Sequence, residues 1–253
     1  MRFLVLNNVM GTVKKSKDFE FKEFLIRQDQ CAMKVGTDGV LLGAWSDVST
    51  ARKVLDVGAG TGVIAIMLGQ RTKEKAAQVH AVEIDTASAH QARENMQAAP
   101  WTDRMALFET SIQEYARTTN QRYDLIVSNP PFFSGGTFSE NQDRNDVRHT
   151  VKLPHGDLLT SVRKLLSDAG RFCVVLPLIE GMRFKEMAAE YGLFCTKVTR
   201  VKPKADKPVE RLLLQFEFED KEEISDELVI QKKARNDWTE AYIELTRDFY
   251  LKM

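Results

Sequence analysis

The sequence predicts an α/β fold with a mostly parallel seven-stranded sheet, one antiparallel strand and helices on both faces. Short apolar runs rich in β-forming residues alternate with longer segments of helical periodicity, the pattern of βαβ units. One of these runs ends in a glycine-rich turn that opens a helix, as in doubly wound folds. Two long apolar runs near the end of the chain are separated by a proline-containing turn, which indicates a hairpin and hence the antiparallel strand.

The composition fits one large domain. The chain has 253 residues, of which 43% are hydrophobic, which is enough for a sizeable core. The cysteines Cys31, Cys173 and Cys195 show neither a metal-binding spacing nor a disulfide framework, which fits a cytoplasmic protein without a metal. No apolar run is long enough to span a membrane.

The formal net charge is +0, so no overall basic field attracts nucleic acid. The charge is unevenly distributed, however. Residues 197–211 contain six basic and two acidic side chains, whereas residues 217–227 contain seven acidic and one basic. Neutrality of the whole chain therefore does not exclude a basic face.

The first fifty residues are predicted to be an extension before the core. Apolar residues alternate between Phe19 and Ile26, which indicates short strands or a hairpin. Thr37 and Asp38 are good N-caps for a helix from Gly39 to Trp45, and the free N–H groups at its start suit a carboxylate ligand. A capped helix without a ligand is the alternative. Met10 is an alternative start of the chain.

The first core strand, Lys53 to Val57, leads into Gly58-Ala59-Gly60-Thr61-Gly62 and an apolar helix. Glycines let the backbone approach a ligand closely. The dinucleotide fingerprint needs a third glycine where Val63 stands, which argues against a nicotinamide-dependent oxidoreductase. With Asp56 just before it, the turn suits a ligand without a pyrophosphate.

The second core strand, Gln78 to Asp85, carries two acidic candidates. Glu83 lies near its carboxyl end, where a carboxylate can accept hydrogen bonds from both ribose hydroxyls. Asp85 competes for this role but more naturally caps the following helix. After the third strand come Ser111 and Ile112, a polar and an apolar side chain that suit contact with the edge of an adenine ring.

The most distinctive stretch follows the fourth strand and reads Ser128-Asn129-Pro130-Pro131-Phe132. Pro130 and Pro131 remove ladder donors and end the strand, so Asn129 is held at a carboxyl end, where α/β sheets bind ligands. The Asn129 side-chain oxygen and the Pro130 carbonyl can each accept an N–H from a planar amine and orient it. Phe132 can stack on a flat base. A surface turn with a proline-rich stop is the alternative.

The other expected elements follow from periodicity. The remaining strands are Met105 to Glu109, Tyr123 to Val127, Arg171 to Leu176, Leu193 to Val201 and Glu210 to Phe218. The remaining helices are Thr86 to Ala98, Asp157 to Asp168, Glu180 to Tyr191 and Trp238 to Leu251. The long loop after Phe132 has a basic far end, formed by Arg144, Arg148, His149 and Lys152.

A family resemblance rests on these residues. Asp56 to Gly62, Glu83 and Asn129 to Phe132 together resemble class I S-adenosylmethionine-dependent methyltransferases that methylate amines. Gln30 to Gly39, Arg148-His149 and Glu210 to Leu214 extend the resemblance to the bacterial tRNA(Val) adenine-N6 methyltransferase family, over most of the chain from Phe19 onwards. The resemblance implies a Rossmann-like fold, S-adenosyl-L-methionine as cofactor and methylation of the N6 amine of the tRNA adenine 3′ of the anticodon. We also expect a monomer.

The resemblance assigns site residues. It implies that the cofactor is bound by Thr37, Asp56, Gly58, Gly60, Glu83, Ile84, Ser111, Ile112 and Asn129, and that Asn129, Pro130, Pro131 and Phe132 hold the target base. Many members carry an acid at or beside Ser111, and Phe132 replaces the commoner Tyr. The expected organisation is an extension over the cofactor (1–50), the methyltransferase core (51–220) and a helical tail packed on the core (221–253).

Other functions remain open at this point. The same Asn-Pro-Pro-aromatic group methylates a glutamine amide in translation release factors, although those enzymes carry a sizeable helical N-terminal domain. Only about fifty residues precede the first core strand here, and they look like strands and loops. Another adenine-N6 RNA or DNA methyltransferase and a non-catalytic RNA-binding module with a relic pocket are further alternatives.

Overall fold

The computed structural model describes residues 18–131 and 153–253. The N-terminal extension begins with an antiparallel pair of short strands, β1 (Phe19–Glu20) and β2 (Leu25–Ile26). Helix α1 (Thr37–Trp45) follows and starts earlier than expected. Gly36 is its N-cap and no side chain caps it, so Thr37 and Asp38 lie in the first turn instead of capping a helix from Gly39.

Within the described residues, the main sheet contains eight strands in the order β10-β8-β9-β7-β6-β3-β4-β5. They are β3 (Lys53–Val57), β4 (Gln78–Glu83), β5 (Met105–Glu109), β6 (Tyr123–Ser128), β7 (Leu166–Pro177), β8 (Phe194–Lys204), β9 (Arg211–Glu217) and β10 (Ile224–Gln231). Strand β9 is antiparallel to both of its neighbours, and the other pairs are parallel. The predicted fold class is confirmed, with eight strands in place of seven.

The additional strand lies in the segment 221–253, which was expected to be a helical tail. Strand β10 pairs in parallel with β8, and Glu227 on β10 forms an ion pair of 2.9 Å with Lys202 on β8. Its first half is exposed and acidic, and Leu228 is its buried residue. These side chains are typical of an edge strand that avoids further pairing. Helix α7 (Glu240–Thr246) follows and is shorter than expected.

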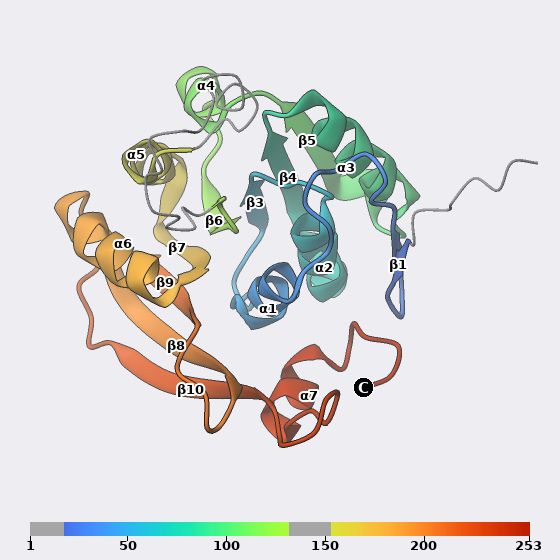
Figure 1. Cartoon of the computed structure of the whole chain (residues 1–253). Coiled ribbons are helices and arrows are strands. Elements are labelled where there is room, and N and C mark those ends of the chain that lie inside the picture. Colours follow the sequence, from blue (N-terminus) through green and yellow to red (C-terminus); the bar gives the residue numbers. More distant parts are fainter. Residues whose placement is uncertain (1–17, 132–152) are drawn as a thin grey trace, which may run out of the picture.

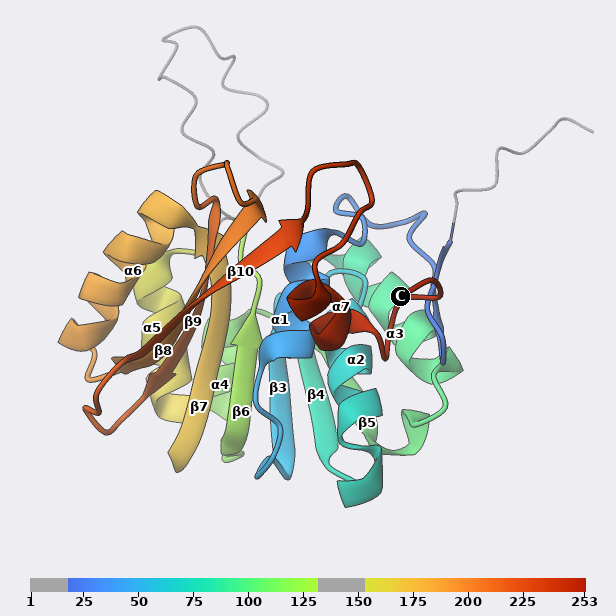
Figure 2. The same cartoon turned by 90° about the horizontal axis from the view of Figure 1, so that it is seen from below.

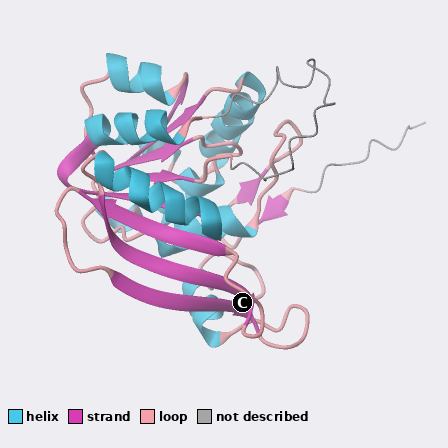
Figure 3. Ribbon diagram, turned by 60° about the vertical axis from the view of Figure 1, so that its left-hand side comes forward, coloured by secondary structure: helices cyan, strands magenta, loops and turns pink. Residues whose placement is uncertain are grey.

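Helices cover both faces of the sheet. They are α2 (Val63–Arg71), α3 (Thr86–Ala98), α4 (Ile112–Thr118), α5 (His155–Leu165) and α6 (Leu178–Glu190), with short 3₁₀ turns at Lys73–Lys75 and Thr102–Arg104. Helices α4, α5 and α6 lie on one face, and α1, α2, α3 and α7 lie on the other (Figure 1). Figure 3 shows the strands in magenta between the two sets of cyan helices.

Alternating residues on the central strands divide the core in two. On β6, Leu125 and Val127 pack with the cluster under α1 and α2, whereas Ile126 packs with the cluster under α5 and α6. This follows from the period of two in side-chain direction along a strand. Because both faces are covered, the central strands are apolar throughout, as the sequence indicated.

The parallel strands all end at one edge of the sheet. Strands β3, β4, β6, β8 and β10 run in the same direction, so the turns that follow them meet at this carboxyl edge (Figure 2). The candidate site is built there, as is usual for α/β sheets.

Candidate active site

The turn between β3 and α2 leaves open space next to its backbone. Gly58, Gly60 and Gly62 have φ angles of +74°, +54° and +79°, which favour glycine. A Cβ atom added at Gly58 or Gly60 would meet no atom within 4 Å, whereas one at Gly62 would lie 3.4 Å from the Cα atom of Ala92. The first two glycines therefore form a cradle that a side chain would fill.

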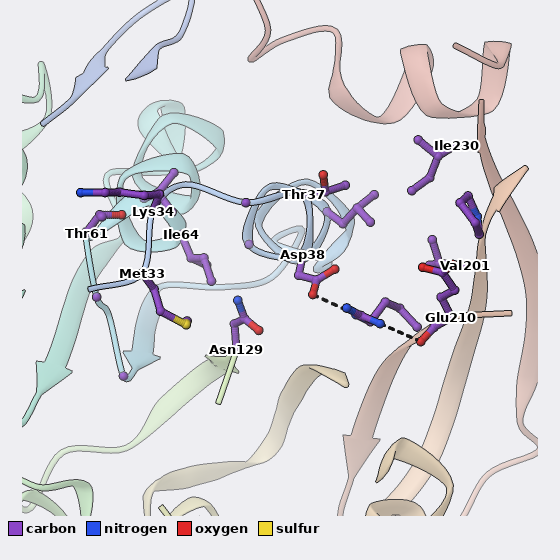
Figure 4. A pocket seen from close by; sticks show the side chains of 18 of the residues that line it. Met33, Lys34, Thr37, Asp38, Thr61, Ile64, Asn129, Val201, Glu210 and Ile230 are labelled. Carbon is purple, nitrogen blue, oxygen red and sulfur yellow. Dashed lines mark hydrogen bonds and ion pairs between the residues drawn. The ribbon is translucent and has the colours of Figure 1, made fainter. Parts of the chain in front are cut away.

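This cradle is part of a cavity of about 580 Å³ at the carboxyl edge of the sheet. One wall comes from the loop before α1, the first turn of α1 and the glycine turn; the opposite wall comes from β8, β9, β10 and the loop after β10. Asn129, at the end of β6, lies between them (Figure 4). The volume is within the range of small-molecule sites.

Asn129 lines this cavity and carries an unpartnered oxygen. Ser128 is buried and its hydroxyl donates to the Val57 carbonyl at 2.9 Å, which fixes the end of β6 against β3. The Oδ1 atom of Asn129 is buried and has no hydrogen-bond partner among the described residues. A buried acceptor without a donor is costly, so this oxygen fits an N–H group supplied by a ligand. Phe132 lies outside the described residues, as does the basic end of the following loop.

Glu83 braces the glycine turn. Its Oε2 atom accepts from the Gly60 N–H at 2.8 Å, and its Oε1 atom accepts from the Asp85 N–H at 2.9 Å. Asp85 caps α3 by accepting from the Ser88 N–H at 2.8 Å, and this hydrogen bond lowers the pKa of the Asp85 carboxyl group. Each Glu83 oxygen retains a lone pair, so the carboxylate can still accept hydrogen bonds from a ligand hydroxyl.

Asp56 lies below the glycine turn and does not line the cavity. Its side chain is fully buried, and Oδ2 accepts from the Ala65 N–H in α2 at 3.0 Å. Burial raises the pKa of Asp56 to about 7; the Ala65 hydrogen bond opposes this shift and the charge of Glu83 adds to it. Direct contact of Asp56 with a ligand stays a prediction; in the structure its hydrogen bond holds the first turn of α2.

The residues expected around an adenine also lie outside the cavity wall. Ser111 caps α4 by accepting from the Glu114 N–H at 3.1 Å, and Ile112 is buried. Ile84 follows β4 and is 45% exposed. The Thr110 N–H donates to the Glu83 carbonyl at 3.0 Å, which joins the ends of β4 and β5 beside these side chains.

The structure thus separates the predicted site residues into those that line the cavity and those that lie outside it. Thr37, Gly58, Gly60 and Asn129 line the cavity. Glu83 and Asp56 support the glycine turn from outside it. Pro130 is buried and Pro131 is partly buried directly after Asn129, which agrees with a rigid strand end.

Sequence reasoning missed several cavity residues. Met33 and Lys34 belong to a loop that α3 holds in place, since the Gln30 N–H donates to the Gln91 side chain at 2.9 Å. Asp38 forms an ion pair of 2.9 Å with Arg211 on β9, drawn as a dashed line in Figure 4. Met33, Lys34 and Asp38 lie in the stretch Gln30 to Gly39, which carries part of the family resemblance, but their contacts depend on tertiary packing and cannot be read from the local sequence.

The described residues offer no metal site and no membrane span. Within 18–131 and 153–253, no three His, Cys, Asp or Glu side chains are grouped so that they could hold a metal ion. In the same ranges, no helix is long and apolar enough to cross a bilayer.

A strand order of this kind, with a glycine turn beside an Asn-Pro-Pro strand end, defines a class I S-adenosylmethionine-dependent methyltransferase. The Methyltransferase small domain family matches residues 35–178. Two solved structures share the fold. A predicted O-methyltransferase from Agrobacterium tumefaciens has a TM-score of 0.66 at 16% identity, covering 84% of this chain and 96% of that one. The glycopeptide N-methyltransferase MtfA with bound S-adenosylmethionine has a TM-score of 0.52 at 15% identity, covering 74% and 100%.

Relatives identified by sequence are more similar to this chain than these solved structures are. The tRNA1(Val) (adenine(37)-N6)-methyltransferase of Trichodesmium erythraeum is 47% identical over 92% of this chain and 98% of its own length. The protein of the same name from Haemophilus influenzae (strain KW20) is 46% identical over the same shares. The chain belongs to the tRNA1(Val) (adenine(37)-N6)-methyltransferase family. This membership does not favour the release-factor alternative.

Proposed function

We propose that the chain transfers a methyl group from S-adenosylmethionine to the N6 amine of adenine 37 in tRNA(Val), the adenine 3′ of the anticodon. The observation that carries the proposal is the buried, unpartnered Oδ1 atom of Asn129 at the edge of the cradle formed by Gly58 and Gly60. An acceptor in this position suits a planar amine brought next to the cofactor. The name shared by the relatives identifies that amine.

Residues of the cavity wall and of its surroundings contact different parts of the cofactor. The N–H groups in the first turn of α1, starting at Thr37, have no intrahelical acceptor and suit the carboxylate of the methionine part. Gly58 and Gly60 leave room for the chain of that part. Glu83 accepts hydrogen bonds from the ribose hydroxyls. Asp56 acts indirectly, by holding α2 and the turn in register.

The adenine of the cofactor binds outside this cavity, beside the end of β4 and the start of α4. Ile84 is an exposed apolar side chain at the end of β4, where it can cover one face of a flat ring. Ser111 and Ile112 lie at the start of α4, at the edge of that ring. In the cap of α4 the Ser111 hydroxyl accepts a hydrogen bond, so its O–H and the backbone N–H of Ser111 both remain to contact the adenine.

Transfer depends on orientation of the amine. When bound, S-adenosylmethionine supplies an electrophilic methyl group on a sulfonium centre. The Oδ1 atom of Asn129 and the carbonyl of Pro130 accept the two N–H groups of the adenine amine and so direct its lone pair. Phe132 stacks on the flipped base. Positioning lowers the barrier, and no metal or general base is needed before the transfer.

The expected partner is tRNA, and we place the protein in the cytoplasm as a monomer. A direct test incubates the full chain with labelled S-adenosylmethionine and either tRNA(Val) transcript or total protein, followed by nucleoside analysis. We expect label in the tRNA as N6-methyladenosine at position 37. Label in protein as methylglutamine, with none in tRNA, would overturn the proposal.

A further inference from the structure

The wall opposite the cofactor cradle is built by the last part of the chain. Strands β8 and β10 are parallel to the central strands, so the turn after β8 and the segment after β10 both lie at the carboxyl edge of the sheet (Figure 2). The segment after β10 is a hairpin, closed by hydrogen bonds from Lys232 N–H to the Asp237 carbonyl and from Thr239 N–H to the Ile230 carbonyl. We call the β8–β9 turn and this hairpin the distal wall.

The two parts of the distal wall are joined. The Nζ atom of Lys204, at the end of β8, donates to the backbone carbonyl of Lys233 in the hairpin at 2.8 Å. Gln231 and Trp238 form a β-bridge across the base of the hairpin. The distal wall is therefore an ordered surface and carries side chains at defined positions.

The inner side of the distal wall is apolar and aromatic. Val201, Ile230 and Trp238 line the same cavity as Asn129. Trp238 is partly exposed, and its ring lies 5.2 Å from the ring of Tyr242 in α7, which fixes its position. None of these side chains belongs to the cradle for the cofactor, so the proposed transfer leaves this half of the cavity unexplained.

The rim of the distal wall is cationic. Lys207, Lys233 and Arg235 are exposed, and none of them forms an ion pair with another described residue. Neighbouring cations are neutralised instead: Lys202 pairs with Glu227, and Lys232 pairs with Glu240. These two ion pairs contrast with Lys207, Lys233 and Arg235, whose exposed charges have no ion-pair partner among the described residues.

We propose that the distal wall binds a nucleotide that flanks the target adenine in the tRNA loop, with its base stacked on Trp238 and the adjoining phosphates at Lys207, Lys233 and Arg235. Base stacking on an aromatic ring and contacts from cations to phosphates are how proteins hold single-stranded RNA. A target adenine that leaves its stack to reach Asn129 pulls its neighbours towards the cavity. The inference rests on the proposed function.

The aromatic part is tested with Trp238→Ala and Trp238→Phe in the full chain. We expect Trp238→Ala to raise the KM for tRNA(Val) by about 5- to 150-fold, the usual effect of losing one stacked base, and to change kcat less. Trp238→Phe retains a ring and should restore KM to within a few-fold of wild type. Cofactor affinity, measured by calorimetry with S-adenosylhomocysteine, should be the same in all three proteins.

The cationic part is tested with the exposed double variant Lys233→Glu/Arg235→Glu. Its affinity for an anticodon stem-loop RNA should fall, and the slope of log Kd against log salt should decrease by about 1.4, since each single-strand phosphate contact contributes about 0.7. The matched control is Arg52→Glu/Lys164→Glu. These two exposed cations lie just before β3 and β7, at the opposite edge of the sheet, and should leave binding unchanged.

The outcomes separate the inference from the proposed function. If wild-type protein methylates tRNA(Val) but Trp238→Ala keeps its KM and the hairpin double variant keeps its salt slope, the distal wall does not hold RNA, while the proposed function stands. If the hairpin and control variants lose affinity equally, the attraction is non-specific and the inference is overturned. If wild-type protein methylates no tRNA, the proposed function itself fails.

Discussion

The environment of Asn129 costs free energy unless a ligand supplies a hydrogen bond to its side chain. Its Oδ1 atom is buried without a donor among the described residues, and two prolines prevent the backbone from relaxing around it. At the wall of a cavity, such an acceptor suits a substrate that supplies the missing donor. The geometry therefore predicts a role in the chemical step that exceeds its role in binding.

Asn129→Ala should lower single-turnover methyl transfer by about 100- to 1000-fold, as expected when one oriented hydrogen-bond partner of the transition state is lost. Affinity for S-adenosylhomocysteine should stay near wild type, because the cradle is formed by the glycine turn. Asn129→Asp should be milder, since a carboxylate still accepts the N–H. Wild-type transfer by Asn129→Ala at saturating tRNA would make the Asn-Pro-Pro turn structural.

Asp56 provides a second residue-scale test, through pH. Its folded pKa of about 7 lies above the value of about 3.9 for an unfolded aspartate, mainly because the side chain is buried. Between these values the folded protein binds the proton more strongly than the unfolded chain. The contribution of Asp56 to the free energy of unfolding is therefore complete below about pH 4 and is lost as pH rises through about 7.

Asp56→Asn removes this titration and retains an oxygen for the Ala65 N–H. Between pH 5 and 8, the melting temperature of the variant should fall less than that of wild type. The difference corresponds to a change in the free energy of unfolding on the order of 1–4 kcal/mol. Thermal melts at several pH values, both proteins in the same buffers, measure it. Parallel curves for the two proteins would show that Asp56 does not titrate in this range.

At the scale of one structural element, the glycine turn between β3 and α2 can be tested by substitution. Gly60→Ala places a methyl group in open space with φ of +54°, which should reduce stability by about 1–2 kcal/mol. Because Gly60 lines the cavity, the same methyl group should weaken binding of S-adenosylhomocysteine by at least about tenfold. Calorimetry and thermal melts measure the two effects separately.

Gly62→Ala is the matched control for this turn. Its φ of +79° gives similar strain, and its Cβ atom would press on Ala92 at 3.4 Å and not on the ligand space. Stability should therefore fall at least as much as in Gly60→Ala, with little loss of cofactor affinity. Equal losses of affinity in both variants would mean that the cradle acts only through its fold.

The elements also show where sequence reasoning succeeds. The β3–turn–α2 unit and the Asn129 strand end are correct because local residues dictate them: glycines at positive φ and prolines that stop a strand. Helix α4 was missed, although Ser111 and Glu114 have the Ser-x-x-Glu spacing of an N-terminal capping box. Its seven residues form only about two helical turns, a length over which apolar periodicity is hard to recognise.

Strand β10 and the distal wall were not predictable in the same way. The acidic residues of β10 resemble a solvated segment until the pairing with β8 brings Lys202 within ion-pair distance of Glu227. Cavity residues such as Ile230 and Trp238 reach the site only because β10 pairs in parallel with β8. Strand pairing across a sheet is a tertiary property, and periodicity in one strand does not specify its partner.

At the scale of the molecule, the two ends of the described chain support each other. The Lys22 N–H donates to the Phe249 carbonyl at 2.8 Å, and Phe21 pairs with Tyr250 in a β-bridge. The Gln70 side chain in α2 donates to the Asp248 carbonyl at 3.1 Å. The last residues thus connect the N-terminal extension to the helix that follows the glycine turn, and we expect them to stabilise the domain as a whole.

Phe249→Ala tests this connection. Phe249 is 2% exposed and belongs to the same core cluster as α1 and α2, so its truncation should cost about 3–5 kcal/mol and lower the melting temperature by roughly 6–20 °C. Leu251→Ala, two positions further and 50% exposed, should change stability by no more than about 0.5 kcal/mol. The hydrogen bond from the Lys22 N–H to the backbone carbonyl of residue 249 can form in both variants. Any difference in melting temperature therefore reports side-chain packing. Equal melting temperatures for the two variants would show that the tail lies on the domain without stabilising it.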